Sequence, residues 1–209
     1  MSGTERPARI ELMDALRGLA VCLMVLHHFL YDLCEFLGAP WWLFTNPVFD
    51  VLHYFFAGLF IFLSGISSDF SRSNLKRGAK AMTLALGITL VTYFMDMTIV
   101  FGVLHLLGVC MMLYPVYKKL PTQALAAVGV VLVVTGYLIS GTVVEAKFLF
   151  PFGFVYEGFT SSDFFPILPH LGWYMLGTVL GRTVYVDKKT RLPGTFRESA
   201  IARFFCWCG

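Results

Sequence analysis

The sequence predicts an all-α fold, a polytopic transmembrane helical bundle with six spans and with both chain ends in the cytoplasm. Of the 209 residues, 57% are hydrophobic and only 14% are charged, whereas a soluble domain carries roughly 25% charged residues. The apolar residues lie in long blocks separated by short charged loops, which is typical of a chain in a bilayer. Blocks such as LAVCLMVL and AAVGVVLVV lack the alternation of barrel strands, so we expect helices.

Six apolar blocks supply the spans of a single membrane domain that covers residues 1–209. A membrane helix needs about 20 apolar residues, with roughly 17 to 25 as the usual range. The blocks lie at residues 16–36, 48–67, 80–95, 101–117, 124–140 and 166–183. The first block is too long for the apolar part of a signal peptide and contains polar residues, so it is expected to be the first span.

The positions of lysine and arginine predict the orientation, because short cytoplasmic loops retain these residues. Every basic residue except Lys147 lies before or within the start of span one, between spans two and three, between spans four and five, or from the end of span six onward. These places share one side of the membrane. The sequence therefore predicts a plasma-membrane protein with a cytoplasmic tail at residues 184–209. Because the basic residues border apolar spans, they indicate lipid headgroups as neighbours and no nucleic acid.

One long connection, residues 141–165, is expected on the outer side. It is rich in aromatic residues, namely Phe148, Phe150, Phe152, Phe154, Tyr156 and Phe159. Two interpretations stay open. The side chains form an interfacial aromatic belt, or the connection is a lid or re-entrant segment over a site.

Ionisable residues inside spans are costly, so they are candidates for function. With the N-terminus inside, all five histidines fall in the outer half of the membrane, and Asp32 and Asp50 lie at a similar depth. A neutral imidazole beside a carboxylate is a good general base near pH 7. The candidates for this chemistry are His28, His105, His53 and Asp32. The alternative for each histidine is an interfacial side chain bonded to a neighbouring helix.

Polar groups on the inner side suit a phosphate-bearing ligand. Asp14 and Arg17 stand three residues apart on one helical face and can pair. The inner basic segment, residues 64–78, is predicted to be a turn that combines small residues with cations. Backbone donors and guanidinium groups bind phosphate oxygens. The candidates there are Ser68, Arg72, Lys76 and Arg77, and no metal-ligand pattern is present.

Four segments resemble the bacterial branch of the heparan-alpha-glucosaminide N-acetyltransferase catalytic family, formerly a domain of unknown function. They are ELMDALRGLAVCLMVLHHFLYDL from Glu11, FFAGLFIFLSGISSDFSRSNLKRG from Phe55, FGVLHLLGVCMML from Phe101 and DFFPILPHLGWYMLGTVLGR from Asp163. They cover most of the chain in the expected order. The wider transmembrane acyltransferase group is marked by an arginine and a histidine separated by ten residues in the first helix, and Arg17 and His28 fit this spacing.

The resemblance implies an acyl-CoA-dependent membrane acyltransferase. A cytoplasmic acyl-CoA, often acetyl-CoA, would present its thioester within the membrane to a hydroxyl or amine of an extracytoplasmic, glycan-like acceptor. Arg17 and the inner basic segment would hold the donor, with His28 as base or relay and His105 as its assistant. The acyl-CoA would be a substrate, and no tightly bound cofactor is expected.

The sequence departs from the family pattern in two places. Lysosomal members carry their active histidine between the first two family helices, but residues 35–47 contain none, so His28 or His53 would substitute. Members also continue with another helix where this sequence stops at Gly209, and we expect that helix to be missing. Two other functions stay open: a proton-coupled small-molecule transporter, and a noncatalytic membrane protein or fragment.

Overall fold

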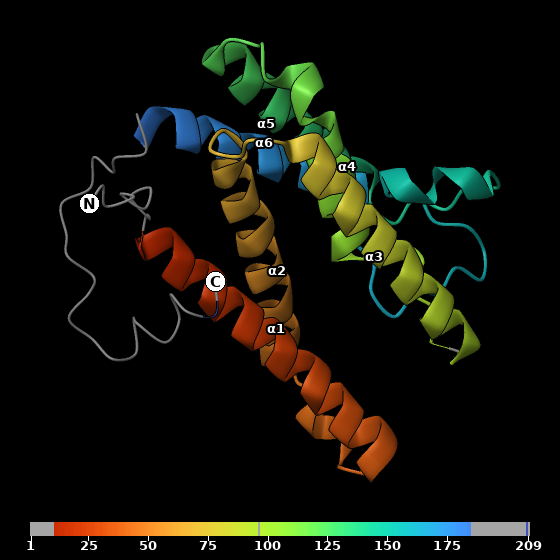
Figure 1. Ribbon diagram of the computed structural model, residues 1–209. Coiled ribbons are helices and arrows are strands. Elements are labelled where there is room, and N and C mark those ends of the chain that lie inside the picture. The colour runs from red at the N-terminus through yellow and green to blue at the C-terminus, as the bar shows by residue number, and fades with distance from the viewer. Residues whose placement is uncertain (1–10, 96, 185–207, 209) are drawn as a thin grey trace, which may run out of the picture. The chain divides into compact units, whose positions relative to one another are not determined.

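The computed structural model describes residues 11–95, 97–184 and 208. These residues form six α-helices and two short 3-10 helices, η1 and η2 (Figure 1). The α-helices are α1 (Glu11–Leu37), α2 (Pro47–Ser68), α3 (Asn74–Phe94), α4 (Val103–Tyr117), α5 (Thr122–Ile139) and α6 (Ile167–Val184). The only β-structure among the described residues is two isolated bridges, Phe101 with Phe164 and Val143 with Val155. The predicted all-α class is therefore confirmed. Of the predicted tail at 184–209, only Val184 and Cys208 lie among the described residues.

Three helices are long and apolar enough to cross a membrane. They are α1 from Leu12 to Leu37, α2 and α5. Helix α4 is apolar but shorter, with 15 residues. Helices of this length and composition are typical of a membrane protein.

The inner basic segment is more helical than the sequence predicts. Helix α2 continues to Ser68 and α3 already begins at Asn74, so only residues 69–73 form the connection. The Ser73 side chain caps α3 by accepting a hydrogen bond from the Lys76 amide at 3.4 Å. An apolar block shows which part of a helix can lie in the hydrocarbon of a membrane. The residue at which the helix begins depends instead on a capping side chain. Lys76 and Arg77 consequently lie in the first turns of α3.

The chain divides into two compact units, and the first comprises the residues up to Leu63 and from Thr183 onward. In it, α1 and the part of α2 up to Leu63 are joined by a turn that contains η1 (Trp41–Leu43). Gly38, at φ +68°, ends α1 in the left-handed conformation that glycine adopts at helix C-termini. The Asn46 side chain accepts a hydrogen bond from the Val48 amide at 2.9 Å and caps α2.

The second unit, Ser64–Arg182, packs its helices closely at glycines. Gly65 of α2 lies against the Tyr174 backbone of α6, and a Cβ at Gly78 of α3 would meet the carbonyl oxygen of Gly108 of α4 at 2.8 Å. Helices in lipid gain their packing energy from such close backbone approach, which small residues permit.

The long connection between α5 and α6 is folded and belongs to the second unit. It contains η2 (Lys147–Phe152). Phe159 packs against Phe150 and Phe164, with ring centroids 6.0 Å and 4.8 Å away, whereas Phe148 is 75% exposed. Asp163 accepts a hydrogen bond from the Val103 amide at 3.1 Å and so ties this connection to the start of α4.

Candidate functional site

Three histidines meet in the first compact unit, two from α1 and one from α2. The rings of His27 and His53 are stacked with their centroids 4.0 Å apart. The ring of His28 lies 5.9 Å from that of His27 and 6.4 Å from that of His53, in both cases edge-on. We call these three residues the histidine cluster. It brings together two of the predicted candidates, His28 and His53.

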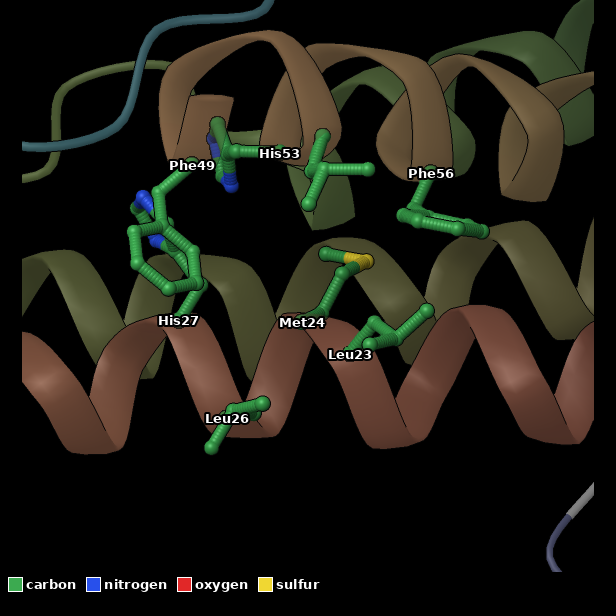
Figure 2. Close-up of a pocket in the computed structure, with 8 residues that line it drawn as sticks. Leu23, Met24, Leu26, His27, Phe49, His53 and Phe56 are labelled. Carbon is green, nitrogen blue, oxygen red and sulfur yellow. The ribbon is translucent and has the colours of Figure 1, made fainter. Parts of the chain in front are cut away.

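The cluster borders a small, mostly apolar pocket between α1 and α2, whose empty space of about 330 Å³ includes open solvent. Figure 2 shows Met24 and His27 of α1 directed toward His53 and Phe56 of α2. The pocket is lined by Leu23, Met24, Leu26, His27, Phe49, Leu52, His53 and Phe56.

The Nδ1 atom of His27 is buried and has no hydrogen-bond partner among the residues that the structure describes. Such atoms are rare in folded proteins and call for an explanation. Here the atom belongs to a pocket-lining imidazole that stacks on a second one. A ring nitrogen in this state can accept a proton without first breaking a protein hydrogen bond.

A carboxylate, Asp50, acts electrostatically on both His27 and His53. It is exposed and lies one turn before His53 on α2. Asp32, the predicted partner, is also exposed, one turn after His28 on α1. The sequence predicts both carboxylates at a similar depth in the membrane, but only Asp32 was among the predicted site residues. The spacing of three between Asp50 and His53 was the available signal.

His27 was also outside the predicted set, although helical spacing could have indicated it. His27 follows Leu23 by four residues, so the two share a face of α1. On α2, Phe49, Leu52, His53 and Phe56 repeat at intervals of three and four, which marks one face of a helix. A pocket between two helices is expected to place a polar residue on each of the two apolar faces, as His27 and His53 do here.

His105 belongs to the second unit and uses both of its ring nitrogens. The Gly102 amide donates to Nδ1 at 3.3 Å, and Nε2 lies 3.2 Å from the Thr89 hydroxyl. That hydroxyl donates to the Ile99 carbonyl at 2.7 Å. An acceptor at Nδ1 requires the neutral tautomer with its proton on Nε2. His105 is 4% exposed, and these bonds join the start of α4 to α3.

Arg17 and Asp14 form the ion pair that their spacing predicts, with 3.3 Å between Nη1 and Oδ1. Arg17 and His28 are eleven residues apart, which is close to three helical turns, so they lie on one face of α1. The rise per residue separates them by about 16 Å along the axis. One helix of the first unit thus carries a cation near its start and the histidine cluster near its end.

The other candidates for donor binding lie in the second unit. Arg72, Lys76 and Arg77 are exposed around the start of α3. The N-terminus of a helix attracts anions through its free amides and its dipole. Ser68 differs, because it is 1% exposed and its hydroxyl donates to the Gly65 carbonyl at 2.6 Å. Its contacts are those of helix packing.

A network that the sequence did not reveal fixes the segment next to these cations. Arg182 of α6 donates from Nε to Asp69 at 3.0 Å, and from its two terminal nitrogens to the carbonyls of Lys118 and Leu120, each at 2.9 Å. The Tyr114 hydroxyl donates to the other oxygen of Asp69. All three guanidinium nitrogens are occupied, so Arg182 joins the ends of α2, α4 and α6. Its partners lie at least 62 residues away in sequence, and no local pattern could identify them.

The arrangement of the histidine cluster differs from that of a metal centre. His27 and His53 meet through their ring faces, whereas an imidazole binds a metal ion through a nitrogen lone pair in the plane of the ring. No group of three or more His, Cys, Asp or Glu side chains in the described ranges is arranged to hold a metal ion.

Comparison with known proteins gives one family. The sequence model described as "Heparan-alpha-glucosaminide N-acetyltransferase, catalytic" matches residues 9–209. Neither the curated proteins nor the solved structures compared with the chain gave a match. The matched range contains the histidine cluster, Arg17 and the inner basic segment.

Proposed function

Because the chain belongs to the heparan-alpha-glucosaminide N-acetyltransferase catalytic family, we propose that it transfers an acetyl group from cytoplasmic acetyl-CoA across a membrane. The acceptor is a hydroxyl or amine of an extracytoplasmic, glycan-like molecule. Membership makes the chain a membrane protein of a transferase family. Our proposal goes further and names the donor, the class of the acceptor and the side of the membrane on which each one binds.

The proposed topology has six spans in the plasma membrane, with both ends of the bundle on the cytoplasmic side. It is supported by the six α-helices and by the sequence positions of the basic residues, all of which except Lys147 fall in ends or connections predicted on one side of the membrane. In this topology α1 begins in the cytoplasm. Arg17 then lies near the inner surface, and the histidine cluster lies in the outer half of the membrane.

The observation that carries the proposal is the histidine cluster beside an apolar pocket. His53 and His27 line the pocket, and His28, which matches the spacing of the acyltransferase group, lies edge-on to both rings. We assign the base to this cluster, with His28 as base or relay and His53 at the pocket. A carboxylate, Asp50, interacts with two of the three imidazoles.

The transfer needs only proton movement from the protein. The acceptor oxygen or nitrogen attacks the thioester carbonyl carbon while its proton passes to an imidazole nitrogen. The new C–O or C–N bond forms, the C–S bond breaks, and the CoA thiolate leaves. The imidazolium then returns the proton to the thiolate, so the cluster is neutral again.

The donor is proposed to bind through its phosphates near the start of α3. Arg72, Lys76 and Arg77 are exposed there, beside the amides that Ser73 caps. Arg17 of the first unit is a separate proposed cation for the donor, and its pairing with Asp14 holds the guanidinium in place. Ser68 and His105 support the site indirectly, since their polar atoms are engaged in helix packing and in the start of α4.

The proposal is tested with membranes that contain the full chain and labelled acetyl-CoA, offered with amino sugars and neutral saccharides. Label on a saccharide is expected for the wild type and is expected to fall by about 100-fold in His28→Ala, the size of a lost general base. His170→Ala is the matched control, because His170 lies in the second unit with its Nδ1 2.8 Å from the Pro166 carbonyl. Transfer that is unchanged in His28→Ala rules out the role assigned to that residue, and no transfer to any saccharide rules out the acceptor class.

A further inference from the structure

One arginine of α6, Arg182, joins two connections of the second unit. Its Nε donates at 3.0 Å to Asp69, which begins the connection between α2 and α3. Its two terminal nitrogens donate to the carbonyls of Lys118 and Leu120, each at 2.9 Å, in the connection between α4 and α5. Because the guanidinium is planar and rigid, it holds the two connections against each other.

The packing of α3 on α4 brings the same two connections to one end of the unit. Near the start of α3, a Cβ at Gly78 would meet the Gly108 carbonyl oxygen of α4 at 2.8 Å. Farther along α3, the Thr89 hydroxyl lies 3.2 Å from Nε2 of His105, close to the start of α4. The two helices are therefore antiparallel, and the end of α4 lies at the same end of the pair as the start of α3.

Both connections carry exposed cations at this end of the unit. Arg72, Lys76 and Arg77 are exposed around the start of α3, and Lys118 and Lys119 are exposed directly after α4. We call these five residues the composite basic surface. Its two halves are distant in sequence, and the contacts of Arg182 hold them together.

Little negative charge is available at these connections to repel an anion. Asp69 is the only acidic residue in the ranges 64–80 and 114–124, and both Arg182 and the Tyr114 hydroxyl bind it. All three nitrogens of Arg182 are engaged with protein oxygens. Arg182 therefore contributes to a ligand site by holding other residues in place.

We infer that Lys118 and Lys119 complete the binding site for the phosphates of the donor, and that Arg182 is a positioning residue for this site. The inference rests on the proposed function, in which the second unit's cations for the donor are those around the start of α3. Acetyl-CoA carries a diphosphate bridge and a separate ribose phosphate. Cations from two connections suit such a ligand, and lysine binds phosphate as a point charge.

The test is the binding of labelled CoA to the purified full chain in an uncharged detergent. Replacing both Lys118 and Lys119 by alanine is expected to raise the Kd for CoA by about 10-fold, the size of a lost charge-assisted contact. Replacing both by arginine keeps the charge and should preserve the affinity. Lys147→Ala is the matched control, because Lys147 is an exposed lysine that the proposed topology places on the other side of the membrane.

Arg182→Lys tests the positioning role, with binding measured below the melting temperature of each variant so that folded chains are compared. The change keeps the charge but loses the fork geometry of the guanidinium, so the Kd for CoA should rise. In the double alanine variant the same change should raise the Kd by a smaller factor, because Arg182 acts through the two lysines.

The outcomes separate this inference from the proposed function. If the wild type does not bind CoA, the proposed donor is wrong and the inference fails with it. If the wild type binds CoA and the double alanine variant binds it equally well, the inference alone is overturned, and a lower content of co-purified anionic lipid in that variant would assign the two lysines to headgroups. An equal loss in Lys147→Ala would show a nonspecific effect of charge and would also overturn it. Effects of Arg182→Lys and of the lysine changes that multiply independently would contradict the positioning role.

Discussion

His53 and His27 face the pocket, whereas His28 is exposed at its edge. This difference separates two roles within one cluster. A ring that lines the pocket can reach a bound acceptor, and a ring outside it acts through its neighbours. Substitution of either kind of ring should lower the rate, but only loss of a pocket-facing ring leaves space that added imidazole can fill.

His53→Ala is expected to lower the maximal rate of acetyl transfer by about 100-fold, with a smaller change in the KM for acetyl-CoA, because the change removes a pocket-facing base. Added imidazole should restore part of the rate, since truncation leaves space for it in the pocket. The measurement is the initial rate of label transfer with and without imidazole. A rate within about twofold of the wild type would contradict a chemical role for His53, given the size of a lost general base.

His105→Ala is expected to act on stability. The change removes two hydrogen bonds and a buried ring, which should cost about 2 to 4 kcal/mol. Thermal unfolding in detergent measures this, and the rate per folded molecule should stay close to that of the wild type. If the melting temperature is unchanged while transfer is lost, His105 takes part in the chemistry.

For the candidate site, the sequence predicts only the approximate depth of each residue along its helix. Depth placed His28, His53 and His105 in the outer half of the membrane, but it could not distinguish the pocket between α1 and α2 from the start of α4. That distinction depends on the turn after Gly38, which sets which face of α2 meets α1. For the same reason depth could not distinguish Asp32 from Asp50, which acts on His27 and His53.

The glycines at which two helices cross allow a prediction about how closely the helices pack. Gly65→Ala should destabilise the chain by about 1 to 3 kcal/mol, because its Cβ would overlap the Tyr174 backbone on α6. Gly87→Ala is the matched control, since nothing lies within 4 Å of its Cβ position, and alanine raises helix propensity by about 1 kcal/mol. Melting temperatures should fall for the first variant and stay or rise for the second. Equal effects would show that the crossing at Gly65 is not closely packed.

The Arg182 network predicts that charge alone does not hold the ends of α2, α4 and α6 together. Arg182→Lys should cost about 2 kcal/mol, because an ammonium cannot reach Asp69 and two carbonyls in the fork geometry of a guanidinium. Lys119→Arg, a change of cation at an exposed position, should have little effect. Thermal unfolding of both variants compares them. A fully stable Arg182→Lys would mean that the pairing with Asp69 is sufficient.

The positions of the helices could be predicted from apolar blocks, but several of their ends could not. The block at 80–95 begins six residues after α3 does, because Ser73 caps the helix within a polar segment that hydropathy does not detect. Arg182, in the last described turn of α6, contacts residues that are distant in sequence. Hydropathy detects neither the local capping bond of Ser73 nor the tertiary hydrogen bonds of Arg182.

At the scale of the whole molecule, the two sides of the proposed bundle differ in chemistry. The family match covers residues 9–209, and the basic residues collect on one side of the predicted spans while the histidine cluster lies toward the other. A donor that is held inside and an acceptor that is used outside would explain why both features occur in one chain.

Sealed, everted membrane vesicles test this sidedness most directly. Their cytoplasmic face is outward, so labelled acetyl-CoA is added outside and an amino sugar acceptor is trapped in the lumen. Transfer across the membrane predicts label on the lumenal acceptor with the wild type and close to none with His28→Ala. Label that appears only on acceptor added to the outside would contradict it.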